Sequence, residues 1–177
     1  MLAGGVAAFA TGGVTVRDIH GHPRAVPEPG SKATVLIFVT QDCPISNSYV
    51  PEINRITGDY SSRDIAFLIV YVDATVTLAT VKKHAEEYGY RAPAVFDARH
   101  VLVERVKATV TPEAAVLDSQ GQILYRGRID DLYPEIGKRR SEPTEHDLRD
   151  ALDAILSGKP VLHPTTKAVG CFISSTP

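Results

Sequence analysis

Cys43 is the residue of this sequence with the clearest chemical potential, because it lies where a buried strand meets a helix. The segment 33–40 (ATVLIFVT) is a continuous run of β-branched and aromatic residues, which is typical of a strand covered on both faces. Pro44 follows the cysteine, and proline is well tolerated in the first turn of a helix. The N–H groups and the dipole of that turn favour a thiolate. The sequence therefore predicts a reactive thiol, and a small buried core cysteine is the competing interpretation.

The neighbours of Cys43 are expected to tune its thiol. Ser46 comes three residues later and can donate a hydrogen bond to the sulfur from the same helical turn. Thr40 comes three residues earlier and could donate from the other side, whereas the Asp42 carboxylate would raise the thiol pKa. Pro44 and Asn47 belong to the same loop and helix start, and we expect them to contact a substrate.

Cys171 is the only other cysteine, and it lies in a C-terminal segment too rich in proline and threonine to be helical. The two cysteines form no Cys-x-x-Cys pair, so their number excludes a structural zinc site made of cysteines. Three interpretations of Cys171 stay open: a resolving thiol that folds back to Cys43, a permanent disulfide with it, or an unpaired buried thiol. The six histidines are scattered, and we expect no metal and no other cofactor.

The elements that must position these residues alternate between strands and helices, which predicts an α/β fold with a parallel section. The turn signal at 118–121 (DSQG) adds an antiparallel hairpin. We expect a central mixed sheet flanked by helices, with an N-terminal β-hairpin and an extended C-terminal tail. In the last helix we expect Thr144 to be the N-cap residue and Gly158 to lie just beyond the C-terminal end. The expected strands are 14–19, 33–40, 65–72, 93–96, 114–117 and 122–125, and the expected helices are 44–60, 78–88, 101–106 and 144–156.

One domain suffices for the 177 residues: a leader at 1–12, a core domain at 13–158 and a tail at 159–177 that packs back on it. Residues 2–10 (LAGGVAAFA) fit the remnant of an export signal, and the alternative is a poorly ordered leader or an edge strand. An export signal implies a periplasmic or other extracytoplasmic location, and without one a cytoplasmic location is expected. No apolar segment is long enough to span a bilayer. The net charge of −2 and the absence of basic runs give no support to nucleic-acid binding.

Four short segments of the sequence form a recognisable pattern: Cys43-Pro44, 110–112 (VTP), 127–131 (GRIDD) and 170–173 (GCFI). Through these segments, residues 13–171 resemble the redoxin branch of the thioredoxin superfamily, which includes the peroxiredoxins (alkyl hydroperoxide reductase/thiol-specific antioxidant proteins). The pattern is similar to that of uncharacterised bacterial thioredoxin-like proteins. The resemblance implies that the Thr111–Pro112 bond is cis, faces Cys43 and presents backbone for pairing with an extended partner.

The sequence departs from both patterns of the superfamily. The thioredoxin dithiol is absent, since the segment after Cys43 is Cys-x-x-Ser. Thr40-x-x-Cys43 matches peroxiredoxins, yet Leu36 stands where their pattern has a proline. A peroxidase also needs an arginine beside the sulfur, for which Arg126 and Arg128 are candidates on one strand face, although an exposed edge pair would have the same spacing.

The resemblance implies a thiol-dependent oxidoreductase, either a disulfide reductase or isomerase or a peroxidase, that acts on a protein disulfide or a peroxide. An external thiol would reduce it, and it would act as a monomer or homodimer. The alternative is a non-catalytic thioredoxin-like binding module whose cleft holds a metal ion or a partner chain. The adjacent Asp130 and Asp131 follow a strand and could bind a cation or move a proton, but aspartates in turns more often cap backbone.

Overall fold

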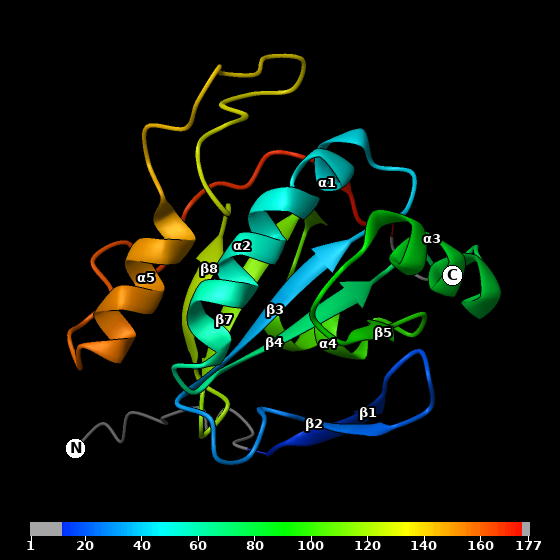
Figure 1. Cartoon of the computed structure of the whole chain (residues 1–177), viewed down its shortest axis with the longest axis horizontal. Helices are drawn as coiled ribbons and strands as arrows, with labels where there is room; N and C mark the ends of the chain where they lie inside the picture. The colour runs from blue at the N-terminus through cyan, green and yellow to red at the C-terminus, as the bar shows by residue number, and fades with distance from the viewer. Residues whose placement is uncertain (1–11, 175–177) are drawn as a thin grey trace, which may run out of the picture.

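A five-stranded mixed sheet forms the centre of the protein (Figure 1). The structure is a computed structural model, and it describes residues 12–174. The strand order is β5-β4-β3-β7-β8, with β3, β4 and β5 parallel and β7 and β8 antiparallel to their neighbours. The α/β thioredoxin-like fold expected from the sequence is thereby confirmed. The strands are β3 (Ala33–Val39), β4 (Ile65–Tyr71), β5 (Ala94–Phe96), β7 (Glu113–Asp118) and β8 (Ile123–Gly127).

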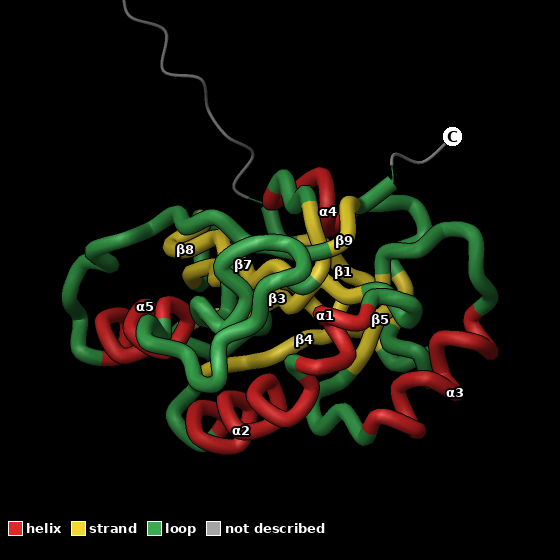
Figure 2. The backbone as a smooth tube through the Cα atoms, turned by 90° about the horizontal axis from the view of Figure 1, so that it is seen from above, coloured by secondary structure: helices red, strands yellow, loops and turns green. Residues whose placement is uncertain are grey.

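Helices cover both faces of this sheet, as the apolar run of β3 predicts (Figure 2). Alternate residues of β3 point to opposite faces: Val35, Ile37 and Val39 join one core cluster, and Leu36 and Phe38 join the other. The first cluster packs under α2, α3 and α5, and the second under α4 and the N-terminal hairpin. The helices are α1 (Pro44–Ser48), α2 (Val50–Ser61), α3 (Leu78–Tyr88), α4 (Val101–Val106) and α5 (Asp147–Leu156).

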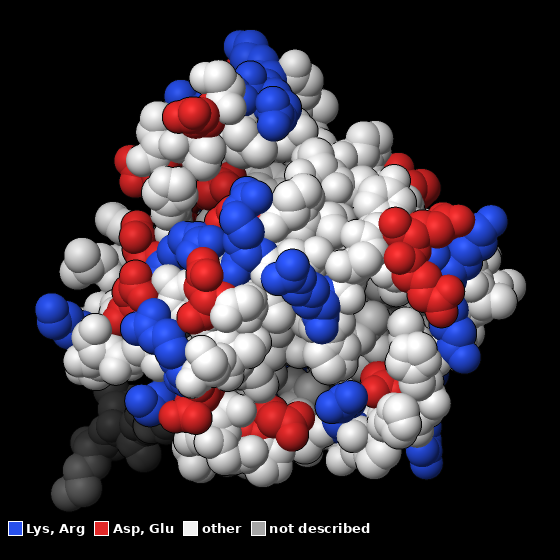
Figure 3. All heavy atoms as spheres, in the orientation of Figure 1, with Lys and Arg blue, Asp and Glu red and all other residues white. Residues whose placement is uncertain are grey.

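The N-terminal hairpin consists of β1 (Val14–Arg17) and β2 (Pro23–Val26), paired antiparallel as expected. The expected leader, 1–12, lies outside the described residues except for its last residue. Over residues 12–174 no helix combines the length and the apolarity needed to cross a membrane. Basic and acidic side chains are interspersed over the face seen in Figure 3.

Two helix boundaries differ from the sequence-based prediction. The helix expected over 44–60 breaks at Tyr49 into α1 and α2, because Pro51 lacks an N–H group and its ring crowds the carbonyl four residues earlier. The last helix begins at Asp147 instead of after a Thr144 cap. The Thr144 amide and hydroxyl both donate to Asp131, each at 2.6 Å, and so do not cap the helix.

A small third sheet was not predicted. It joins β6 (Val110–Thr111) to β9 (Cys171–Phe172) in antiparallel register, with Thr111 opposite Cys171. Strands of two residues show no periodicity, so the sequence contains no signal for them. The tail reaches this sheet along the edge of β8, where the Arg126 amide donates to the Pro164 carbonyl at 2.9 Å.

Candidate active site

Cys43 is the N-cap residue of α1, as the sequence predicts, with φ −83° and ψ 108°. Its Sγ accepts a hydrogen bond from the amide of Ser46 at 3.5 Å. As a thiol it donates to the carbonyl of Thr111 at 3.2 Å. The sulfur therefore lies between the first turn of a helix and the segment before Pro112, and the Thr111–Pro112 peptide bond is cis.

The chain's own C-terminal strand covers this sulfur. Cys43 is fully buried, with an exposed fraction of 0%. Cys171, placed by the pairing of β9 with Thr111, lies beside Cys43, and its side chain and backbone both lower the pKa of Cys43. Both cysteines are free in this structure. The Cys43 sulfur is thus covered by residues of the same chain.

The two thiols influence each other's ionisation in opposite directions. Burial raises the pKa of Cys43, but hydrogen bonds from Cys171 and from Ser46 outweigh it and leave the pKa below its ordinary value of 9.0. Burial and the hydrogen bond to Cys43 raise the pKa of Cys171 to about 12, and the nearby Asp42 carboxylate acts in the same direction. Within the pair, Cys43 therefore loses its proton more readily, and Cys171 retains it.

Ser46 is completely buried, and its backbone amide is the group that donates a hydrogen bond to the sulfur. Its hydroxyl lies near the sulfur and helps to lower the pKa of Cys43, although it forms no regular hydrogen bond with any described group. Thr40 acts differently from the expectation. Its hydroxyl hydrogen-bonds to the Thr111 hydroxyl at 3.2 Å, so it links the cysteine loop to the loop of Pro112 and does not contact the sulfur directly.

Asn47 holds the cysteine loop in place. Its amide nitrogen donates to the Gln41 carbonyl at 3.0 Å, and its side-chain oxygen lies 3.1 Å from Nε2 of His84. Nδ1 of His84 lies 2.8 Å from the Tyr71 hydroxyl. Since Asn47 Oδ1 can only accept, the neutral imidazole donates through Nε2 and accepts at Nδ1. Pro44, also expected among the substrate contacts, is exposed at the rim of the site.

His84 is a site residue that sequence reasoning missed. It is buried beneath the loop, and this burial lowers its pKa below the ordinary 6.5, which favours the neutral form that the hydrogen bonds require. A signal for it did exist. Val81, His84 and Ala85 are spaced three and four residues apart, so helical periodicity places the imidazole on the buried face of α3.

The two candidates for a peroxide-binding arginine bind other groups of the protein. They are Arg126 and Arg128. The Arg126 guanidinium donates to the carbonyls of Val106 and Lys107 at 3.1 and 2.9 Å, and Arg128 forms a bidentate pair with Asp147 at 2.6 and 3.2 Å. Neither arginine is among the groups that shift the pKa of Cys43. The expectation that one of them contacts the sulfur is therefore not met in this structure.

The aspartate pair Asp130–Asp131 stabilises the loop after β8. Asp131 accepts hydrogen bonds from Thr144 and Glu145. Asp130 accepts one from the Tyr49 hydroxyl at 2.6 Å, and burial raises the pKa of its carboxyl group. Across the described residues, no group of three or more His, Cys, Asp or Glu side chains is arranged to hold a metal ion.

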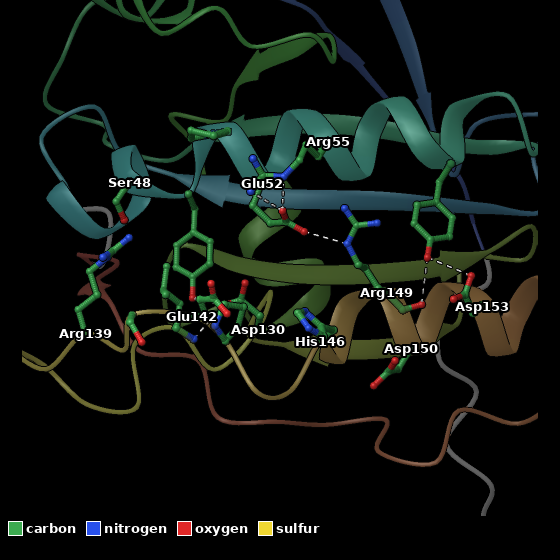
Figure 4. Close-up of a pocket in the computed structure, with 16 residues that line it drawn as sticks. Ser48, Glu52, Arg55, Asp130, Arg139, Glu142, His146, Arg149, Asp150 and Asp153 are labelled. Atoms are coloured by element: carbon green, nitrogen blue, oxygen red, sulfur yellow. Dashed lines mark hydrogen bonds and ion pairs between the residues drawn. The ribbon is translucent and has the colours of Figure 1, made fainter.

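Asp130 also lines a hollow of about 750 Å³ between α2 and α5 (Figure 4). Polar and charged side chains from both helices project into it and already bind one another, since Arg149 pairs with Glu52 at 2.8 Å and the Tyr60 hydroxyl donates to Asp153 at 3.0 Å. Neither cysteine lines this hollow. The candidate sulfur pair therefore lies outside this hollow.

Comparisons with known proteins agree with this geometry. The Redoxin family model matches residues 27–139, more than half of the chain. A hypothetical protein from Sinorhizobium meliloti is similar at 27% identity, with 92% of this chain and 91% of that one covered and a TM-score of 0.79. An uncharacterised conserved protein from Geobacillus kaustophilus shows 26% identity, coverage of 94% and 90%, and a TM-score of 0.78.

A secreted disulfide oxidoreductase of Mycobacterium tuberculosis, homologous to E. coli DsbE, shares the fold at 16% identity, with coverage of 82% and 95% and a TM-score of 0.55. No curated protein sequence matches significantly. The family match covers β3, the cysteine loop and the Thr111–Pro112 segment together. The chain therefore belongs to the Redoxin family of the thioredoxin superfamily.

Proposed function

We propose that the protein is a thiol–disulfide oxidoreductase in which Cys43 is the nucleophile and Cys171 is the second redox thiol. One observation carries this proposal. Thr111 accepts a hydrogen bond from the Cys43 thiol and pairs with Cys171, which places the two thiols beside each other at the start of α1, and the pKa of Cys43 is lowered while that of Cys171 is raised to about 12. A pair of this kind supplies one thiolate that attacks first and one thiol that can attack in the second step.

The proposed cycle transfers two electrons to a disulfide. The Cys43 thiolate attacks one sulfur of a partner disulfide, forming a mixed disulfide and expelling the partner's other sulfur as a thiolate that takes up a proton. Cys171 then loses its proton and attacks the Cys43 sulfur. The second partner thiolate leaves, and a Cys43–Cys171 disulfide remains. An external dithiol reduces this disulfide and completes the cycle.

A peroxide is the second candidate substrate, because the Cys171 thiol is already placed to condense with an oxidised Cys43. In that case Cys43 thiolate would attack the peroxide O–O bond, giving a sulfenic acid and an alcohol or water, and Cys171 would displace water to form the same disulfide. The engagement of Arg126 and Arg128 away from the sulfur favours the disulfide substrate over the peroxide.

Steady-state assays with an oxidised protein substrate and with hydrogen peroxide, each in the presence of a dithiol reductant, test the proposal. We expect turnover of the disulfide to be lost in Cys43→Ser. Cys171→Ser is the matched variant, and it should retain the first attack and accumulate a mixed disulfide detectable by mass spectrometry. Unchanged turnover in Cys43→Ser would reject the proposal. Tight Cu(I) binding without any turnover would favour the non-catalytic binding module instead.

A further inference from the structure

The C-terminal tail binds the cleft as an extended peptide would. Strand β9 pairs antiparallel with β6, with Cys171 opposite Thr111. The pairing continues beyond the strand, where the Ile173 amide donates to the Thr109 carbonyl at 3.0 Å. This backbone pairing places the tail cysteine beside Cys43, because the Thr111 carbonyl also accepts a hydrogen bond from the Cys43 thiol. The position of Cys171 therefore shows how a cysteine on any extended segment would be presented to the nucleophile.

The residue before this cysteine is confined by backbone atoms. A Cβ atom placed on Gly170 would overlap the carbonyl carbon and oxygen of Thr111 and crowd the nitrogen of Pro112. These atoms belong to the peptide at the base of the cleft, and they cannot rotate away as the end of a side chain could. The close approach of the two backbones thus requires glycine at this position.

The positions after the cysteine are held less tightly. Phe172 is 86% exposed, so the site places little restriction on the side chain that directly follows the cysteine. Ile173 turns back and packs against the core cluster beneath α4. The tail therefore defines a pattern of glycine, cysteine, an unrestricted residue and an apolar residue.

From this pattern we infer that the cleft receives an extended segment of a partner protein in which glycine directly precedes the reactive cysteine. In the structure without a partner, the C-terminal tail occupies the position of that segment, and it leaves this position when the partner binds. This inference rests on the proposed function, since it names the substrate class of the same site. It also explains why Cys43 is fully buried in a protein proposed to react with other proteins.

Peptide exchange provides the test. The full-length variant Gly170→Ala/Cys171→Ser displaces the tail sterically and leaves Cys43 as the only thiol. The probe is a peptide of residues 168–174 (AVGCFIS) whose cysteine is joined to 5-thio-2-nitrobenzoate. Attack by the Cys43 thiolate forms a Cys43–peptide disulfide and releases the coloured thiolate, so one disulfide is exchanged for another without net oxidation.

We expect the native peptide to react at least about tenfold faster than the same peptide carrying Gly170→Ala, as is usual for steric discrimination in a pocket. A peptide carrying Phe172→Lys is the matched control and should react within about twofold of the native peptide, because that side chain is exposed. The single variant Cys171→Ser, which retains its tail, should show the same preference at lower rates.

The outcomes separate this inference from the proposed function. Equal rates for the glycine and alanine peptides, in a protein whose Cys43 reacts readily with symmetrical dithionitrobenzoate, would reject the inference and leave the proposed function intact. Failure of Cys43 to react with either peptide or with dithionitrobenzoate would overturn both. The folded state of each variant is checked by circular dichroism, and Cys171→Ser alone supplies the comparison if the double variant does not fold.

Discussion

The pKa of the Cys43 thiol lies below its ordinary value in a site without solvent exposure, because hydrogen-bond donors replace water around the sulfur. Burial alone would raise the pKa of the thiol, as it does for Cys171. The Ser46 amide at 3.5 Å, the Ser46 hydroxyl and the Cys171 thiol all favour the negative charge and reverse that effect. At the scale of single residues, the reactivity of this centre depends on donors that the site itself supplies.

Replacement of Ser46 by alanine tests this view. Ser46→Ala removes one donor, and we expect the pKa of Cys43 to rise, so the pH midpoint of its alkylation by iodoacetamide should move upward. The sign follows because only the thiolate reacts, and loss of a donor destabilises the thiolate. Ser48→Ala is the control, since the Ser48 hydroxyl donates to the Ile45 carbonyl and not to the sulfur. An unchanged midpoint in Ser46→Ala would contradict this account.

At the scale of elements, we expect the contact between the tail and β8 to govern access to Cys43. The Thr166 amide donates to the Arg126 carbonyl at 3.1 Å, and the Thr166 hydroxyl bonds to the Tyr125 hydroxyl at 2.7 Å and accepts from the Arg128 amide at 3.1 Å. A side chain on Gly127 would overlap Thr166, so the tail lies directly on the strand. This contact precedes β9 along the chain and holds it over the sulfur.

Thr166→Val keeps the size of the side chain and removes its hydroxyl. Loss of hydrogen bonds worth about 1–2 kcal/mol should increase the population with an open tail by about 5- to 30-fold. We expect alkylation of Cys43 in the folded protein to accelerate by a similar factor, as measured by mass spectrometry over time. Thr165→Val is the matched control, because the Thr165 side chain is exposed. Equal acceleration in both variants would show that the hydroxyl of Thr166 does not restrain the tail.

At the scale of the whole molecule, one carboxylate joins the loop after β8 to the segment that leads into α5. Asp131 accepts bonds from Thr144 and Glu145, and its carboxylate pairs with Arg140 at 3.2 Å. Burial works against the charge, yet the hydrogen bonds from Thr144 and Glu145 and the charge of Arg140 hold the pKa of Asp131 at about 2. Since α5 covers one face of the sheet, this carboxylate helps to close the fold.

The pKa of Asp131 predicts how stability changes with pH. The folded pKa of about 2 lies below the ordinary 3.8, so the carboxylate stabilises the fold above about pH 4, and this contribution is lost as the pH falls towards 2. Asp131→Asn should lose roughly 1–2 kcal/mol of unfolding free energy at pH 7 and show a weaker acid dependence, measured by urea denaturation. Asp64→Asn is the control, since Asp64 is exposed and its φ of 64° is one that asparagine tolerates. This variant should show the same unfolding free energy and the same acid dependence as the parent protein.

Much of the fold follows from patterns within short stretches of the sequence. The doubly buried β3, the helix 78–88 and the N-terminal hairpin all match their predicted places. Cys43 and Ser46 lie three residues apart, so a single helical turn brings them together without help from the rest of the chain. The hydrogen bond between the Thr40 and Thr111 hydroxyls could not be predicted in this way, because it joins residues 71 positions apart.

The amino-acid sequence by itself determined the mixed sheet and the thiol at a helix start, because backbone propensity and side-chain periodicity act between near neighbours. Only the tertiary structure decided what surrounds that thiol. The placement of Cys171 beside Thr111 depends on a two-residue strand, and the directions of Arg126 and Arg128 depend on partners from α4, β7 and α5. Such contacts form only when distant segments meet in the folded chain, so no local pattern encodes them.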